Sequence, residues 1–441
     1  MTAARTLRAA RGLLWWRGRG LSLFAALALW LALPQAASAQ SPATILGMSS
    51  RSIGLGGAVS ASVADFSSVY YNPAGLANRT DLQLSLGPNL VIPNFWYSNF
   101  AGKFSGVTDP YLMNQFGAVV PIGGPLKKKV AVGVGMMTPF PTLTSIRIRT
   151  PEEPSFVFTE DLLQTPMIAF GLGFRPNKYL TLGAGGQLLI QAEGTVRTAF
   201  DLANARITQR DTALTINPVI APIIGFQIVP IRYVRIGGFW RFEVKPSVSL
   251  PFSADTGIVG FTSNFVSNVL YSPPQLGGGV SFEFLDKFVV SFDGVFVQSS
   301  KTPSPGVHVR VTPDALFAPI VTVDPNPGFS DTFQLHGGLE YKYNEDIRFR
   351  TGYFRRVTPV PEQAYDTSFL DESINAISIG AGITLKDPTE ILEKPFTMDM
   401  HVQYQFMDSG RAKRASALQP VGDLKFGGSI IAIGFNGTVR F

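Results

Sequence analysis

Segments of about ten residues with alternating apolar and polar side chains recur along the chain from Thr80 onward. The clearest spans residues 396–406, where one face carries Phe396, Met398, Met400, Val402, Tyr404 and Phe406. The other face carries Thr397, Asp399, His401, Gln403 and Gln405. A period of two over this length predicts a β-strand with one apolar and one polar face. Residues 333–343 and 234–244 show the same alternation.

The chain contains fourteen such segments, and the connections between them alternate in length. The segments lie at 80–92, 116–122, 130–138, 166–174, 180–192, 214–229, 234–250, 273–284, 288–298, 333–343, 347–357, 375–385, 396–407 and 425–441. Residues 175–179, 230–233, 285–287 and 344–346 are short connections, whereas 139–165 and 299–332 are long ones. Short turns at one end and long loops at the other, around an even number of strands, are typical of a bacterial outer-membrane barrel. A soluble sandwich has no reason for this asymmetry, so we predict an all-β fold, a 14-stranded antiparallel transmembrane β-barrel.

The first 39 residues have the features of a signal peptide. A basic region with Arg5, Arg8, Arg11, Arg17 and Arg19 precedes an apolar stretch at residues 21–33. Residues 37–39, Ala-Ser-Ala, then give a small-residue cleavage site before Gln40. A membrane-spanning helix is the alternative, but the apolar stretch is shorter than the roughly 20 residues that a span needs, and Pro34 ends it. Export to the bacterial outer membrane is therefore expected.

Charge and composition exclude several classes of protein. Lys and Arg number 37 against 31 Asp and Glu, but five of the arginines belong to the leader, so the rest of the chain carries 32 against 31. This balance predicts no nucleic-acid partner. There is no cysteine, and no later apolar run reaches the ~18 residues of a membrane helix. A closed barrel has no edge that requires a partner, so a monomer is expected.

The C-terminal strand supports the barrel prediction. Its apolar face carries Ile431, Ile433, Phe435, Gly437, Val439 and Phe441, and the chain ends on Phe441. A terminal aromatic residue on an amphipathic strand resembles the recognition signal of outer-membrane barrel proteins.

Residues 40–78 precede the first strand and alternate poorly. They are rich in apolar side chains, and a barrel of fourteen strands encloses an interior that needs a plug or leaves a channel. We therefore predict three parts: a signal peptide at 1–39, an N-terminal hatch that plugs the barrel at 40–78, and the barrel at 79–441. A tail outside the barrel is the alternative.

The hatch carries a pattern that identifies a family. It contains a glycine-rich stretch at residues 54–58, then Ala64-Asp65, then Asn72-Pro73-Ala74-Gly75. Two later stretches, 271–284 (YSPPQLGGGVSFEF) and 350–385, are also similar to the family. Together they resemble the FadL family of outer-membrane transporters for long-chain fatty acids and aromatic hydrocarbons, over essentially the whole mature chain. Phe66 departs from the pattern, because the family often carries a second acid there.

The resemblance implies passive uptake of hydrophobic small molecules, without catalysis. The outer loops would capture the ligand, an apolar pocket would hold it, and a shift of the hatch would release it sideways near the third strand. The hatch motif is Asn72, Pro73, Ala74 and Gly75, and the candidates for the lateral opening are Gly133, Gly135 and Pro139. Glycine there is equally consistent with making room for neighbouring side chains. Pocket candidates are Ile45, Leu46, Met48, Arg235 and Arg241, the two arginines as partners of a carboxylate. Packing within the plug is an equal alternative for Ile45, Leu46 and Met48.

Two other functions are conceivable for such a barrel, an enzyme and a scaffold. His401 and Asp399 share the polar face, but no serine near them has the context of a nucleophile, so we expect no catalytic residue, metal site or cofactor. Expected partners are a fatty acid or hydrocarbon ligand and outer-membrane lipid or detergent-like molecules. A barrel scaffold for protein export or surface attachment is the alternative function. The proline-rich residues 302–331 suit either function, as a binding lid for transport or as a docking site for the scaffold. A polar, sealed interior would favour the scaffold, and an apolar tunnel would favour transport.

Overall fold

A computed structural model describes residues 42–441, apart from residues 107, 127, 142–152, 157, 160–164, 202–205, 245–247, 256–259, 268–270, 305–306, 314–319, 322–325, 364–366, 387–393 and 413–422. The predicted signal peptide lies outside the described residues.

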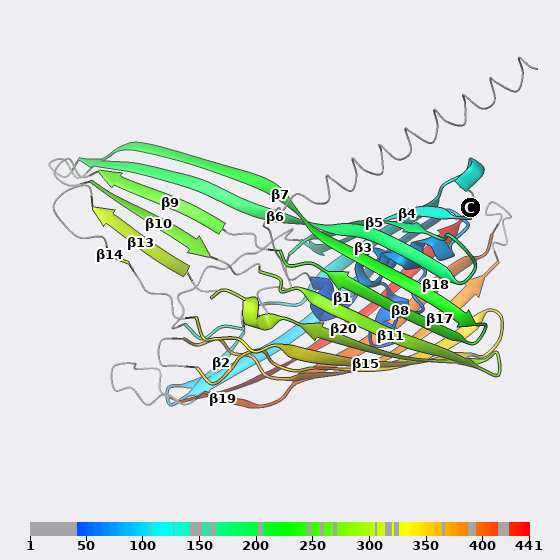
Figure 1. Cartoon of the computed structure of the whole chain (residues 1–441). Helices are drawn as coiled ribbons and strands as arrows, with labels where there is room; N and C mark the ends of the chain where they lie inside the picture. Colours follow the sequence, from blue (N-terminus) through cyan, green and yellow to red (C-terminus); the bar gives the residue numbers. More distant parts are fainter. Residues whose placement is uncertain are drawn as a thin grey trace, which may run out of the picture. The chain divides into compact units, whose positions relative to one another are not determined.

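Fourteen of the described strands form a closed ring, each paired antiparallel with its two neighbours (Figure 1). In ring order they are β1 (Gln83–Asn99), β3 (Tyr111–Pro121), β4 (Val130–Phe140), β5 (Met167–Phe174), β6 (Leu180–Asp201), β7 (Arg206–Ile231), β8 (Val234–Arg241), β11 (Gln275–Phe284), β12 (Phe288–Val297), β15 (Thr332–Lys342), β16 (Ile347–Arg356), β17 (Ile374–Leu385), β18 (Phe396–Met407) and β20 (Leu424–Arg440). The last strand closes on the first, with Gln83 opposite Arg440 and Ser98 opposite Lys425. The predicted 14-stranded barrel is confirmed.

The short connections fall where the sequence places them, at one end of the ring, which we call the turn end; the opposite end is the loop end.

One predicted strand is wrong. Residues 234–250 do not form a single strand, because β8 ends at Arg241 and residues 248–255 form β9 (Val248–Asp255), which pairs with β6 and β10. Pro246 lies between them and has no N–H to donate to a ladder. The hairpin of β6 and β7 also extends well past the predicted 192 and 214.

Short strands join the ring at the loop end. β9 pairs in parallel with β6, β10 (Gly260–Ser267) pairs with β9, β13 (Val307–Pro313) pairs with β10, and β14 (Ile320–Val321) pairs with β13 (Figure 1). The proline-rich residues 302–331 therefore contribute two strands to this sheet. β2 (Gly102–Ser105) pairs antiparallel with the end of β1, and β19 (Gly410–Ala412) pairs antiparallel with the start of β20. The 3₁₀ turns η2 (Gly124–Leu126) and η3 (Ser299–Lys301) lie in connections.

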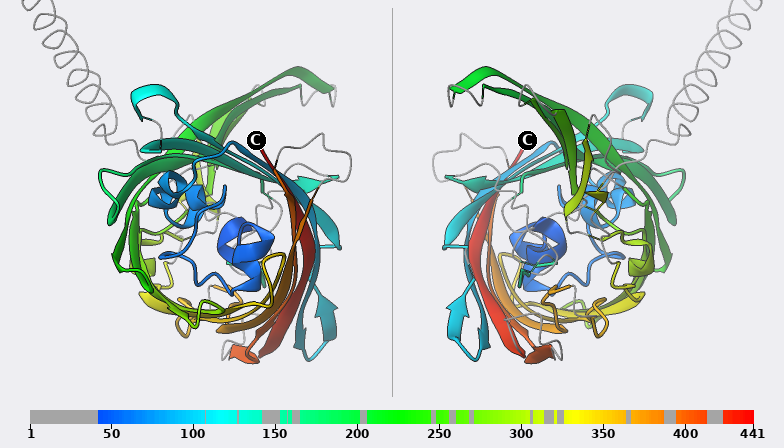
Figure 2. Two further views of the ribbon diagram at one scale, coloured as in Figure 1. Left: turned by 90° about the vertical axis from the view of Figure 1, so that its right-hand side faces the viewer. Right: turned by 90° about the vertical axis from the view of Figure 1, so that its left-hand side faces the viewer.

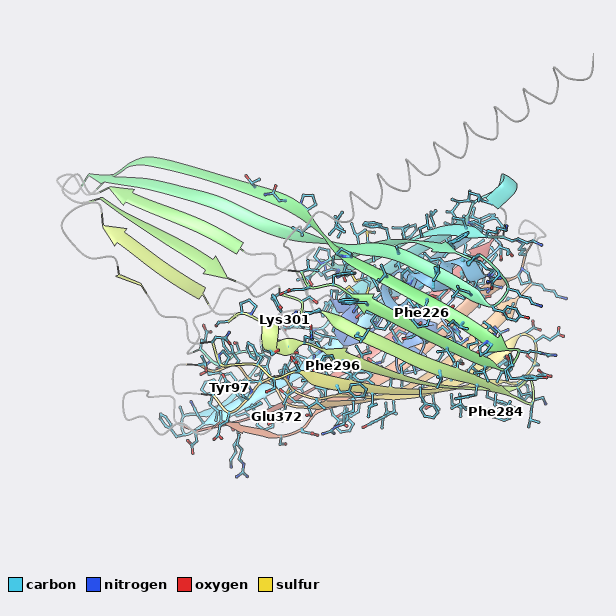
Figure 3. The ribbon with its side chains drawn as sticks, viewed as in Figure 1. Tyr97, Phe226, Phe284, Phe296, Lys301 and Glu372 are labelled. Atoms are coloured by element: carbon cyan, nitrogen blue, oxygen red, sulfur yellow. The ribbon has the colours of Figure 1, made fainter. Side chains whose placement is uncertain are left out.

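The outward face of the ring is apolar, the reverse of a soluble protein. Leu86 is 62% exposed and Phe292 is 56% exposed, and many other large apolar side chains point outward from all around the ring. Phe226, Phe284 and Phe296 belong to this set (Figure 3). So large an apolar surface is stable only in contact with lipid. The alternation of β18 is confirmed, since Thr397, His401, Gln403 and Gln405 are buried while Val402 and Tyr404 are exposed.

None of the helices within the described residues is long and apolar enough to span a membrane.

Residues 42–78, which we call the plug, lie inside the ring (Figure 2). They form α2 (Pro42–Leu46), α3 (Ser50–Gly54), α4 (Ser68–Tyr71) and η1 (Pro73–Asn78). These helices are too short to be stable alone, so contacts with the wall must hold them. The apolar side chains of the plug are almost all buried, among them Leu46, Met48, Val59, Val63 and Leu76.

Candidate functional site

The Asn72–Pro73 turn fastens the plug to itself and to the wall. The Asn72 side chain is fully buried, and its Nδ2 donates to the carbonyl oxygens of Ser60 and Phe226, each at 2.9 Å. Its Oδ1 accepts from the Ala74 N–H at 3.2 Å and so caps η1, while Pro73 occupies the first turn, where its missing N–H costs nothing. Gly75 follows because a β-carbon there would lie 2.3 Å from the Val63 carbonyl oxygen. The Asn72 side chain thus joins three parts of the molecule: η1, the plug backbone at Ser60 and the wall strand β7.

Wall glycines let the plug backbone approach the strands directly. A β-carbon on Gly183 in β6 would lie 2.1 Å from Ala74 N, and one on Gly237 in β8 would lie 2.2 Å from Ser60 O. On another part of the ring, a β-carbon on Gly352 in β16 would lie 2.1 Å from Gly56 N. These contacts leave no space for a side chain of any size. Several strands therefore carry glycine on the inward face because the plug occupies the space.

Polar groups of the wall pair with the backbone of the plug. Asp293 Oδ2 accepts from the Ser60 N–H at 2.7 Å, and His336 Nδ1 lies 2.7 Å from Gly56 O. Near α3, the carboxylate of Glu340 bonds to Arg51 at 3.3 Å and to Arg350 at 2.7 Å. Buried charges of this kind are tolerated when they are paired and hydrogen-bonded. They hold the plug at the level of β12, β15 and β16.

The interior changes from polar to apolar toward the loop end. Along β1 the buried inward residues run from Gln83, Ser85 and Asn89 to Val91 and Phe95; along β20 they run in reverse, from Leu424, Phe426 and Ile430 to Asn436 and Thr438. Four fully buried methionines lie in this apolar half: Met48, Met113, Met137 and Met167. Methionine adapts its shape to its surroundings, so this region can repack around a guest.

Two loop segments run side by side above this apolar region, and we call their described residues 153–156, 158–159 and 367–373 the lid. The Ser155 N–H donates to Ser368 O at 3.1 Å, and the Leu370 N–H donates to Ser155 O at 2.8 Å. Phe156 points inward, with its ring 5.0 Å from that of Phe95 and 6.2 Å from that of Phe426. The lid therefore places an aromatic ring in the mouth of the apolar region.

An ion pair holds the lid on the wall. Arg356 at the end of β16 lies 3.3 Å from Asp371, and it also donates to Phe158 O at 3.3 Å. Thr358 donates to the other oxygen of Asp371 at 2.7 Å. Burial raises the pKa of Asp371, and Arg356 opposes that rise. Docking of the lid thus removes the Asp371 side chain from water, which favours its protonated form.

A cavity of about 70 Å³ remains between the plug and the wall. Ile45 and Arg241 line it, whereas Leu46 and Met48 pack in the adjoining apolar cluster. The Arg241 guanidinium donates to Tyr70 O at 2.6 Å and lies 4.3 Å from the centre of the Tyr70 ring. Arg235 lies elsewhere, in a separate chamber at the turn end. The structure therefore separates the two arginines that the sequence grouped.

The candidates for a lateral opening lie on the inward face of β4. Gly133 pairs with Val119 and Gly171, and Gly135 pairs with Gly117 and Ala169, so both glycines have a partner residue on each side. Pro139 pairs with Met113 of β3 only. β-Carbons on Gly133 and Gly135 would lie 2.5 Å from Leu76 and 2.4 Å from Met48, respectively. In this conformation plug side chains fill the space over both glycines.

Sequence reasoning missed the lid and the apolar half of the interior. Phe156 and Leu370 lie in loops, where no periodicity points to burial. The inward residues Met113, Met137 and Met167 gave a signal, because apolar residues on both faces of a strand end indicate an apolar interior. Phe66, the departure from the family pattern, fills the space over Gly117, where a β-carbon would come 2.0 Å from its ring.

Among the described residues, no group of three or more His, Cys, Asp or Glu side chains is placed to hold a metal ion.

No protein-family model and no curated protein matches the sequence. The fold, however, matches solved structures of hydrophobic-compound transporters. A FadL homologue of Pseudomonas aeruginosa aligns with a TM-score of 0.59 at 14% identity, over 92% of this chain and 99% of that one. The toluene transporter TodX of P. putida gives 0.57 at 16% identity, over 88% and 97%. The toluene transporter TbuX of Ralstonia pickettii gives 0.55 at 15% identity, over 90% and 99%. The resemblance drawn from the hatch motif is confirmed at the level of the fold.

Proposed function

We propose that this protein is a passive channel of the bacterial outer membrane for hydrophobic small molecules. The observation that carries the proposal is the apolar interior between lid and plug, lined by aromatic rings and buried methionines. An apolar solute is poorly soluble in the polar outer layer of the membrane, and an apolar interior offers it a path of lower free energy. The alternative, a scaffold, has no use for such an interior.

Capture would begin at the lid. The cavity between plug and wall is far smaller than the roughly 300 Å³ of a typical ligand pocket, so the apolar interior is closed in this structure. Displacing the Phe156 ring from between Phe95 and Phe426 opens the apolar region to the loop end. The buried methionines then repack around the solute, because their side chains are unbranched and flexible.

The next step is movement of the plug, and the bonds to the wall favour a local one. Between described residues, the wall bonds to residues 42–48 only through Gln405, whose Nε2 lies 2.7 Å from Ile45 O. The wall bonds to residues 49–78 from many strands. For example, Gln115 accepts from the Ser49 N–H at 2.8 Å, and Asn436 accepts from the Ser50 N–H at 2.6 Å. Since each such bond contributes about 0.5–1.5 kcal/mol, shifting residues 42–48 costs far less than shifting the whole plug.

Lateral release near β4 fits this local movement. Met48, at the end of the loosely held segment, covers Gly135, and Leu76 covers Gly133. Withdrawal of Met48 would remove the side chain nearest to Gly135, where Val69 and Phe66 of the plug also lie close. The plug would thus act as a hatch that seals the wall as well as the interior.

The solute class that we favour is uncharged hydrophobic compounds. Two guanidinium groups line the described cavity, those of Arg241 and Arg356. Arg241 bonds to Tyr70 O and Gln275, and Arg356 bonds to Asp371 and Phe158 O. To pair with either guanidinium, a carboxylate ligand would have to break the bonds that Arg241 or Arg356 already makes within the protein. Transport of toluene by two proteins of this fold agrees with the choice.

Uptake by cells tests the proposal. Cells with the gene, without it, and with it restored would receive labelled toluene and labelled oleate at equal aqueous activity. We expect the gene to raise the initial rate for toluene at least several-fold and the rate for oleate less. Equal rates in all three strains for both solutes would overturn the transport function. A faster rate for oleate alone would overturn the preference for uncharged solutes.

A further inference from the structure

A second and larger chamber lies at the turn end of the barrel, with a volume of about 560 Å³. One side of it is formed by the plug residues Arg51, Ala61, Ser62, Ala64 and Asn78 and by the adjacent Arg79. The ends of β5, β6, β7, β8, β15, β16 and β20 form the rest. It is separate from the apolar region and faces the other end of the ring.

The chamber is strongly basic. Nine of its nineteen lining residues are Arg or Lys and one, Glu340, is acidic; the cations are Arg51, Arg79, Arg175, Lys178, Arg232, Arg235, Lys342, Arg348 and Arg440. The chain after the leader is almost neutral, so this clustering is not a consequence of composition. Low-dielectric walls concentrate the field of such a cluster and raise the local concentration of anions.

Some of these cations already have partners. Arg51 pairs with Glu340 at 3.3 Å, Arg232 pairs with Asp286 at 3.0 Å, and Lys342 and Arg235 share Glu283.

Four guanidinium groups of the chamber, those of Arg79, Arg175, Arg348 and Arg440, form no ion pair with any residue that the structure describes. Arg79 donates to Ala64 O, and Arg175 donates to Asn78. The Nε of Arg440 is buried and has no hydrogen-bond partner among the described residues. A buried donor without a partner destabilises the structure, and an anion at this place would offset that cost.

The cations also crowd one another. Burial lowers the pKa of the Arg79 guanidinium, and Arg440 and Arg51 lower it further, while Asp65 acts in the opposite direction. Burial likewise lowers the pKa of Arg175. Arg440 of β20 and Arg51 of the plug therefore repel Arg79, which follows the plug, and Asp65 offsets part of that repulsion. An anion among them would relieve the repulsion.

We propose that this chamber binds a phosphate group. Guanidinium groups hold phosphate oxygens through paired N–H donors, and several of them suit a divalent oxyanion better than a monovalent carboxylate. The volume admits a free phosphate with its water or the headgroup of an anionic lipid. A phosphate between Arg79, which directly follows the plug, and Arg440 of β20 ties the end of the plug to the wall. The proposal does not rest on the transport function.

Calorimetric titration of the full mature protein in an uncharged maltoside detergent tests it. The ligands are inorganic phosphate, a short-chain phosphatidic acid and decanoate, at an ionic strength held constant with chloride. The chamber variant is Arg79→Gln with Arg440→Gln. The matched control is Arg355→Gln with Arg411→Gln, two cations of the loop end. Retention of the barrel is checked by heat-modifiable gel mobility.

We expect phosphate or phosphatidic acid to bind, and the chamber variant to lower the affinity by more than about tenfold, since bonds to charged groups contribute about 1.5–3 kcal/mol each. The control pair should bind as the unaltered protein does. Arg79→Lys with Arg440→Lys keeps the charge, and we expect an intermediate loss because the planar fork is gone.

Binding of inorganic phosphate identifies the free anion as ligand, and binding of the lipid alone identifies a headgroup. Three results would overturn the proposal: no binding of either phosphate compound, equal loss in the chamber and control variants, or decanoate binding as tightly as phosphate.

Discussion

Replacing Asn72 by alanine should loosen the plug without disturbing the barrel. The side chain makes three hydrogen bonds: from Nδ2 to Ser60 O and Phe226 O, and to Oδ1 from the Ala74 N–H. At about 0.5–1.5 kcal/mol for each of the three bonds, the opening free energy of this turn should fall by about 2–4 kcal/mol. Ser60 O keeps a bond from Gln227 at 3.1 Å, which limits the loss.

Hydrogen exchange of the Ala74 and Gly75 amides in nanodiscs measures this effect. Because each 1.4 kcal/mol is a factor of ten, Asn72→Ala should raise their exchange rates by about 30- to 700-fold. Asn72→Asp keeps the cap but sets a negative oxygen against two carbonyl groups, so it should be at least as damaging. Asn94→Ala, at an exposed position of β1, is the control. A change of less than threefold in Asn72→Ala, or an equal change in the control, would refute this role of the Asn72 side chain.

Three further predictions concern the lid and β4. Phe156→Ala should raise the initial rate of toluene uptake several-fold, because the ring no longer blocks the apolar region, and Phe156→Leu should raise it less; a slower rate in both would contradict the role of the lid. Gly135→Leu forces Met48 aside. Because overpacking costs about 1–3 kcal/mol, this variant should speed hydrogen exchange of the Met48 amide about 5- to 140-fold. Unchanged exchange would show that the space between Gly135 and Met48 admits a larger side chain. Burial raises the pKa of Asp371, so the docked lid binds a proton more tightly than the free lid. Docking is therefore strongest below the ordinary pKa of an aspartate and weakens as the pH rises to the raised value. The hydrogen-exchange protection factor of the Leu370 amide should therefore fall over that pH range. In Asp371→Asn the protection factor should not change with pH. A protection factor that rises with pH would contradict the role of Asp371 in docking.

The barrel could be predicted because its two faces have opposite chemistry. Each strand crosses lipid on one side and a polar or plugged interior on the other, so the period of two appears in residues such as Val402 and Gln403 without any knowledge of the partner strands. The error at 234–250 has the same origin. Alternation continues across Pro246, and periodicity does not show that the chain leaves the ring at Arg241 and continues in a separate strand, β9, that pairs with β6.

The plug could be located but its contacts could not be predicted. The Asn72 motif marked a turn, yet its partners Ser60 and Phe226 depend on how the plug sits against β7, which no local pattern encodes. The same holds for Arg235 and Arg241. Both lie on the inward side of one strand, but the plug divides the interior between them, and only the three-dimensional structure shows which chamber each one enters.

The glycine contacts between plug and wall have a consequence for the order of assembly. Plug backbone lies against Gly183, Gly237 and Gly352 on well-separated strands, and it bonds to Asn436 on the final strand. A segment held on so many sides, with no space left for a side chain, has no route into a ring that is already closed. The plug must therefore be in place before β20 pairs with β1, and the closing of that seam completes both the wall and its contents.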